Sequence, residues 1–183
     1  MKPLIKIITI AFLVATVQNA NAQWIQITSG VSVNLNDVFF PTPSLGYIVG
    51  DSGTVLKTTD TGNTWQSIYT DSSLSFQSVY FTSVDTGYVA GGKLYKTTDG
   101  GITWIQIFSD TLNSVQEVYF VNNLLGFAGT SDKVYKTQDG GSNWSEIIAG
   151  NSFNSIYFPS PNVAILLEAL ILVTLYTKLL MAD

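Results

Sequence analysis

The acidic residues that recur most regularly in the sequence are Asp60, Asp99 and Asp139, which stand about 40 residues apart. Carboxylates can ligate a metal ion or exchange a proton with a substrate. Each of the three, however, lies in its own copy of one motif, Thr-x-Asp-x-Gly-x-x-Trp. Three aspartates in three separate repeat units cannot share one site. The pattern therefore favours a structural role over metal binding or catalysis.

The composition excludes most other catalytic chemistry. The 183 residues include 13 acids and 8 cationic residues, all of them Lys, and Arg, His and Cys are absent. Zinc sites built from Cys and His, Ser-His-Asp and Cys-His nucleophile systems, and redox dithiols are thereby excluded. The net charge of −5 argues against nucleic acid as a partner. We expect a protein with no catalytic residue, no metal site and no cofactor.

The motif is one turn of a longer unit of four short strands, rich in aromatic and β-branched residues. An apolar strand comes first, a Gly-led strand second, and a strand ending in Lys-Thr third. The fourth strand starts at the Trp of the motif. Four such strands in ~40 residues are typical of a propeller blade. The predicted ranges are 37–40, 78–81, 117–120 and 155–158 for the first strands, 46–50, 87–91 and 126–129 for the second, and 55–58, 94–97 and 134–137 for the third.

The fold class is therefore all-β, a partial propeller of three four-stranded blades. Two orphan strands flank the blades, one beginning at Trp24 and one at Ser155. These pieces do not close a ring, so we expect an open arc and a longer parent protein.

The motif residues have clear structural tasks. Gly62, Gly101 and Gly141 supply the positive φ of a tight turn. The aspartate side chain accepts hydrogen bonds from backbone N–H groups of its own turn. The aromatic rings that cover the turns are Trp65, Trp104 and Trp144.

The motif resembles the Asp-box, or BNR repeat. The longer unit, Gly-Tyr-x-x-Gly followed by Tyr-Lys-Thr-Thr-Asp-Gly-Gly-x-x-Trp, resembles the photosystem II stability and assembly factor-like family of secreted bacterial proteins. The likeness covers roughly residues 23–162. It implies a non-catalytic propeller that serves as a protein-binding or assembly scaffold. That family's binding face is basic and Arg-rich, whereas this chain has no Arg, so the partner stays open between a protein and a glycan.

The alternative is a fragment of a secreted glycan-active hydrolase, because Asp-boxes also occur in such enzymes. A sialidase would need an arginine cluster for its substrate carboxylate, and none is present. A xyloglucanase-like enzyme would need paired carboxylates, for which Asp51, Asp85 and Asp132 are loop candidates. Lysine recurs at equivalent positions, as Lys57, Lys96 and Lys136. These side chains form either a ring of charge or, in the favoured interpretation, solvated positions at strand edges that prevent unwanted strand pairing.

Residues 1–22 are predicted to be a signal peptide. Lys2 and Lys6 precede a short apolar run, and Ala20-Asn21-Ala22 supplies a small-x-small cleavage pattern. The mature chain is expected to begin at Gln23. It would be exported to the periplasm, the outer surface or the medium.

The repeat pattern stops after Asn162, and the tail, residues 163–183, is apolar. Val163 to Ala182 is long and apolar enough for a membrane-spanning helix, although it contains Glu168. The favoured interpretation is a frameshifted fourth blade. Shifted by one nucleotide, codons for residues 163–168 can spell Gly-Tyr-Ile-Val-Gly, and those for residues 176–183 can spell Tyr-Lys-Thr-Thr-Asp-Gly-Gly. A membrane is a partner only if the tail is a genuine helix.

Overall fold

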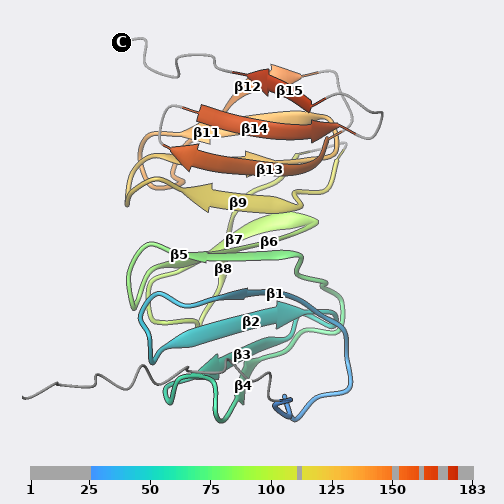
Figure 1. The fold of residues 1–183 in the computed structure, drawn as a ribbon. Helices are drawn as coiled ribbons and strands as arrows, with labels where there is room; N and C mark the ends of the chain where they lie inside the picture. The colour runs from blue at the N-terminus through green and yellow to red at the C-terminus, as the bar shows by residue number, and fades with distance from the viewer. Residues whose placement is uncertain (1–25, 111–112, 150–152, 161–162, 169–172, 177–183) are drawn as a thin grey trace, which may run out of the picture.

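The chain forms four antiparallel β-sheets that follow one another in a stack (Figure 1). The computed structural model describes residues 26–110, 113–149, 153–160, 163–168 and 173–176. Three sheets have four strands and the last has three, and in each the strands are joined in sequence order. Every pairing between neighbouring strands is antiparallel, as in a propeller blade. The all-β class and the partial propeller are confirmed.

The sheets are named blade 1, blade 2, blade 3 and the terminal sheet. Blade 1 contains β1 (Leu35–Phe39), β2 (Gly46–Gly50), β3 (Val55–Thr58) and β4 (Gln66–Tyr69). Blade 2 contains β5 (Ser78–Phe81), β6 (Gly87–Gly91), β7 (Lys93–Thr97) and β8 (Ile105–Phe108). Blade 3 contains β9 (Glu117–Phe120), β10 (Gly126–Gly129), β11 (Lys133–Thr137) and β12 (Ser145–Ala149). The terminal sheet contains β13 (Phe153–Ser160), β14 (Val163–Glu168) and β15 (Val173–Tyr176).

The predicted strands lie within a few residues of these bounds. The fourth strands begin one residue after each Trp, because the Trp itself still belongs to the turn. The orphan strand predicted at Trp24 is not continued in the structure: residues 26–34 form no strand, and Trp24 lies outside the described residues. The predicted signal peptide, residues 1–22, also lies outside them.

The tail forms strands where it is described. Residues 163–168 pair with β13, and residues 173–176 pair with residues 163–168, so the helical alternative is wrong for these segments. No helix in the described part of the chain has the length and apolarity that crossing a membrane requires. The frameshift stays a prediction, which the nucleotide sequence after the Asn162 codon would test.

The core lies between the blades. The first strands β1, β5, β9 and β13 lie side by side in turn. Tyr47 of β2 stacks on Phe81 of β5 with ring centroids 3.8 Å apart, and Tyr88 repeats the stack on Phe120 at 3.9 Å. These rings are buried. A Cβ added at Gly87 would come within 2.5 Å of the Phe81 ring, so the ring lies flat on β6 only because that residue is glycine.

The backbone at the start of β5 and of β9 donates a hydrogen bond to the blade before it. Asp37 accepts a hydrogen bond from the Val79 amide at 2.8 Å, and Ser78 accepts one from the Val118 amide at 3.4 Å. Each bond joins one blade to the next at the same repeat position.

Candidate functional site

The Asp99 carboxylate accepts four hydrogen bonds from residues of its own turn. Its Oδ1 accepts hydrogen bonds from the Thr103 amide at 2.9 Å, the Ile102 amide at 3.1 Å and the Thr97 hydroxyl at 2.8 Å. Its Oδ2 accepts one from the Thr103 hydroxyl at 2.6 Å. These four hydrogen bonds hold the carboxylate against its own turn and close the turn as a structural element.

The other two copies repeat this geometry. Asp60 accepts bonds from the Thr64 amide at 2.9 Å and the Thr64 hydroxyl at 2.7 Å. Asp139 accepts bonds from the Asn143 amide at 2.8 Å and the Asn143 side-chain amide at 2.7 Å. Each aspartate lies in its own blade, and the structure does not bring the three together. No group of three or more acidic residues in the described part of the chain could hold a metal ion.

The glycine of each turn supplies the left-handed backbone that was expected. Gly62, Gly101 and Gly141 have φ of 84°, 89° and 88°. Their amides donate to the Thr hydroxyl that begins the motif, at 2.9–3.0 Å. Each Trp packs edge-on against a Phe of its own blade, in the pairs Trp65–Phe40, Trp104–Phe81 and Trp144–Phe120.

The turns also bind the preceding blade. Tyr47 and Lys57 of blade 1 both donate to the Gly100 carbonyl, each at 3.1 Å. Tyr88 and Lys96 of blade 2 donate to the Gly140 carbonyl at 3.0 and 2.9 Å. Burial raises the pKa of Tyr88 to about 12, so its hydroxyl stays a donor.

The expectation for the lysines is therefore corrected. Lys57 and Lys96 lie on the third strands, which are not edges, and their ammonium groups are used in the contact with the next blade. They are neither a free ring of charge nor edge-solvating residues.

Acid should weaken these turns. Hydrogen bonds, chiefly from the side chains of Thr103 and Asn143, lower the pKa of Asp99 and Asp139 from 3.8 to about 2. The pKa of Asp60 is also lowered, first by the Thr64 amide. A folded-state pKa below the unfolded value adds stability above about pH 4, and this is lost as the pH falls towards 2. We expect the urea midpoint to drop across that window.

The matched variant is Asp99→Asn. It should be less stable than the parent at pH 7 and should show a shallower loss between pH 4 and 2. An identical acid profile for parent and variant would contradict a role for this carboxylate.

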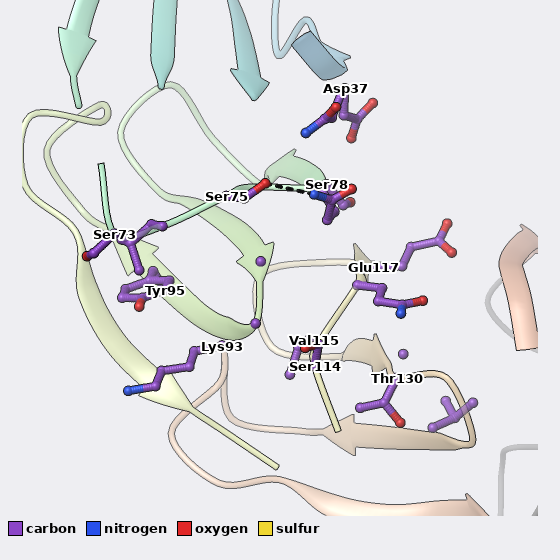
Figure 2. Close-up of a pocket in the computed structure, with 18 residues that line it drawn as sticks. Asp37, Ser73, Ser75, Ser78, Lys93, Tyr95, Ser114, Val115, Glu117 and Thr130 are labelled. Atoms are coloured by element: carbon purple, nitrogen blue, oxygen red, sulfur yellow. Dashed lines mark hydrogen bonds between the residues drawn. The ribbon is translucent and has the colours of Figure 1, made fainter. Parts of the chain in front are cut away.

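A cleft opens at the opposite ends of the strands from the Asp-boxes. Its volume is about 1130 Å³. The boxes follow the ends of β3, β7 and β11, whereas the cleft is lined where β5, β7 and β9 begin and where β6 and β10 end. Figure 2 shows residues of all three blades around it. Those labelled there are Asp37, Ser73, Ser75, Ser78, Lys93, Tyr95, Ser114, Val115, Glu117 and Thr130.

The lining is polar and contains few charges. The lining consists of hydroxyl and amide side chains together with the exposed backbone of Gly92. Ser75 accepts a hydrogen bond from the Gln77 side chain at 3.0 Å (Figure 2). Both oxygens of Asp37 are engaged, by the Val38 and Val79 amides at 2.8 Å. Such a surface offers hydrogen bonds to a ligand. The Asp37 carboxylate, held by two backbone amides, is not free to act as one of the two carboxyl groups of a hydrolase.

The loop acids considered for hydrolysis do not meet. Asp85 lies in the β5–β6 loop, at the Asp-box end, where its carbonyl accepts a bond from Gly100. Asp51 lies in the β2–β3 hairpin of blade 1 and Asp132 in the β10–β11 hairpin of blade 3. Bonds from Ser75, Asn34 and Asn36 hold the pKa of Asp51 below its usual value. The structure provides no pair among these three residues.

The cleft was not found by sequence reasoning. Its residues come from the connections between blades, 70–77 and 109–116, and from hairpins of different length and sequence. The available signal was a second recurrence of polar residues, outside the Asp-boxes. Lys93-x-Tyr95 and Ser114-x-Gln116 match Lys133-x-Tyr135 and Ser75-x-Gln77 of a neighbouring repeat, and they could have been singled out on that ground.

Comparison with known proteins agrees with the fold. The family model described as photosynthesis system II assembly factor YCF48 matches residues 16–152. A structure of YCF48 bound to D1 peptide is 26% identical with a TM-score of 0.66, covering 79% of this chain and 50% of that one. YCF48 from Cyanidioschyzon merolae is 24% identical with a TM-score of 0.70, covering 81% and 54%.

A weaker likeness extends to glycan-active enzymes. An ancestral GH74 enzyme is 18% identical with a TM-score of 0.58, covering 72% of this chain and 21% of that one, which shows a shared fold alone. A search of curated proteins gave no match. The chain spans about half the length of the YCF48 structures that it matches.

Proposed function

The chain belongs to the family of the photosynthesis system II assembly factor YCF48, and we propose that it is a non-catalytic propeller that holds a segment of a partner protein in its cleft. The observation that carries the proposal is the cleft itself, polar and shared by three blades. Its volume of about 1130 Å³ exceeds the roughly 300–1,000 Å³ of small-molecule sites, which are mostly apolar. A peptide backbone would find both donors and acceptors there.

The carboxylates support binding over hydrolysis. Glycoside hydrolysis requires one carboxyl group to protonate the leaving group and a second to act as base or nucleophile. Asp37 is committed to two backbone amides, and the loop acids lie apart. A similar family member, YCF48, has been solved with a D1 peptide, which supports a protein partner.

The partner need not be the D1 protein. This chain has no Arg, and among the described residues that line the cleft Lys93 is the one cation. We therefore propose an extended, largely uncharged protein segment, with the D1 peptide as the first probe.

Ser114→Trp should block the cleft. Ser114 is exposed at its rim, so an indole there fills space without disturbing the core. For the D1 peptide, or for peptides selected by display on the chain, we expect calorimetry to show affinity lowered at least ~10-fold by the loss of contacts and by steric exclusion.

The control is Ser67→Trp, an exposed position on the outer strand β4, which should leave binding unchanged. Failure to select any peptide, or binding that Ser114→Trp leaves intact, would refute the proposal. Release of reducing ends from xyloglucan would favour the hydrolase instead.

Export is part of the proposal and rests on residues 1–22 alone. N-terminal sequencing of the protein from its native host should begin at Gln23. A cytoplasmic protein whose sequence still begins at Met1 would exclude export.

A further inference from the structure

A carboxamide residue stands at the same place in each of the three blades, where the first strand begins. These residues are Asn36, Gln77 and Gln116. All three are exposed, and all three line the cleft. A carboxamide donates from its nitrogen and accepts at its oxygen, as a peptide group does. Each of these side chains can therefore pair with the main chain of a bound segment.

The backbone turns these side chains out of the sheets. Asn36 is a bulge in β1, because the residues on either side of it pair with consecutive residues of β2. The Gln77 amide donates at 2.7 Å to the Ala90 carbonyl, although Ala90 is already paired with the next residue of the chain. The Gln116 amide has the same relation to Gly129, at 2.8 Å. Such an extra residue re-aims its side chain, here into the cleft.

Asn36 shows how this position binds a main chain. Its Nδ2 donates at 2.7 Å to the carbonyl oxygen of Phe76, in the connection that enters blade 2. The Phe76 amide donates at 3.1 Å to the Gly50 carbonyl of blade 1. The residue before it, Ser75, forms an isolated antiparallel bridge with Asp51. Blade 1 thus binds an extended segment through both main-chain groups of one residue, and the carboxamide supplies the donor.

The two glutamines keep hydrogen-bonding capacity that Asn36 has used. Asn36 Nδ2 donates to a second acceptor as well, Asp51 at 3.3 Å. Gln77 donates to the Ser75 hydroxyl (dashed in Figure 2), and its oxygen accepts no hydrogen bond from a described residue. The Gln116 side chain makes no hydrogen bond to any residue that the structure describes. Each glutamine is also one methylene longer than Asn36, so its carboxamide reaches further from the sheet.

We propose that Gln77 and Gln116 bind the main chain of the protein segment that the cleft holds, as Asn36 binds the Phe76 carbonyl. This contact depends on the proposed function and specifies how the segment is recognised. The backbone N–H and C=O groups of the segment, rather than its side chains, make the polar contacts with these two blades. Main-chain hydrogen bonds supply affinity, whereas side-chain pockets supply specificity. The partner is therefore a class of extended segments of varied sequence, without proline where a glutamine accepts the N–H.

Replacing each glutamine by methionine tests the two contacts. Methionine keeps an unbranched side chain of similar length and removes the carboxamide. For the D1 peptide, or for a peptide selected by display on the chain, we expect Gln77→Met and Gln116→Met each to lower affinity on the order of 10-fold in calorimetry, because one or two hydrogen bonds are lost. Both residues are exposed, so the urea midpoint should change little. Gln66→Met, at an exposed position on the outer strand β4, is the matched control.

N-methylated peptides test whether the contact is to the backbone. Methylating one peptide nitrogen at a time removes a donor and leaves every side chain in place. We expect two positions at which methylation lowers affinity for the parent chain. One of them should become insensitive in Gln77→Met and the other in Gln116→Met, because the accepting oxygen is already gone. Alanine substitution of the peptide at these positions should cost less than methylation.

The outcomes distinguish a failure of these contacts from a failure of the proposed function. If no peptide binds, or if Ser114→Trp leaves binding intact, the proposed function fails and the contacts with it. If Ser114→Trp blocks binding while both methionine variants bind as tightly as the parent, the cleft holds the segment through other groups, and only the role of the glutamines is overturned. Methylation costs that stay the same in the methionine variants would overturn that role as well.

Discussion

Replacing Tyr88 by alanine is expected to lower the free energy of unfolding by about 3–5 kcal/mol, the range for removing a large buried ring. Tyr88 is fully buried and stacks on Phe120 of the next blade. Its hydroxyl donates to the Gly140 carbonyl, which then keeps only Lys96 as a donor from blade 2. One substitution thus removes both the packing and part of the hydrogen bonding between blades 2 and 3. Urea denaturation monitored by tryptophan fluorescence measures the loss.

Tyr88→Phe separates the two contributions. The ring stack is retained and one hydrogen bond is lost, so the expected cost is about 1 kcal/mol. Equal losses for the two variants would mean that the hydrogen bond rather than the stack dominates. A loss below about 1 kcal/mol for Tyr88→Ala would show that the interface contributes less than its burial implies.

Gly91→Ala is expected to destabilise the chain by about 3 kcal/mol, the upper end for overpacking. A Cβ there would lie 2.1 Å from the Ser75 carbonyl oxygen and 2.7 Å from the Phe76 Cα, both backbone atoms. Relief requires β6 to separate from the connection that enters blade 2. Because Gly91 also lines the cleft, peptide binding should weaken together with stability.

The neighbouring residue is the control for Gly91. Gly92 has φ of 72° but nothing within 4 Å of an added Cβ. Gly92→Ala should therefore cost only the left-handed backbone penalty, about 1–2 kcal/mol. If both alanine variants lose the same amount, the close approach of the backbone at Gly91 is not the cause.

The repeat made the blades predictable from sequence. Gly46 begins β2 and pairs with Thr58, which ends β3. A glycine at the one bound and the first residue of an Asp-box at the other made both bounds recognisable in the sequence. The Gly-led strands were placed residue by residue for the same reason. The strand predicted from the duplicated Trp-Ile-Gln-Ile stays a prediction, because Trp24 lies outside the described residues; residues 26–34, which follow it, form no strand.

The contacts between blades could not be predicted in the same way. Lys57 and Gly100 are 43 residues apart, and only the stacked arrangement of the sheets brings the ammonium group to that carbonyl. The cleft depends on such long-range placement too, since Ser75 and Ser114 belong to different connections and Lys93 begins β7. Local propensity indicates the strand, but it does not indicate which atoms of the following repeat the strand will meet.

The hydrogen bonds that join one blade to the next all span similar lengths of chain. The bonds made by Asp37, Tyr47, Lys57, Ser78, Tyr88 and Lys96 connect residues 37 to 53 positions apart. Loop-closure entropy depends on that separation and not on total length. Each added blade therefore closes the same loop at the same entropic cost, and relative contact order falls as the array grows. Folding can proceed blade by blade from any starting point, as in linear repeat proteins.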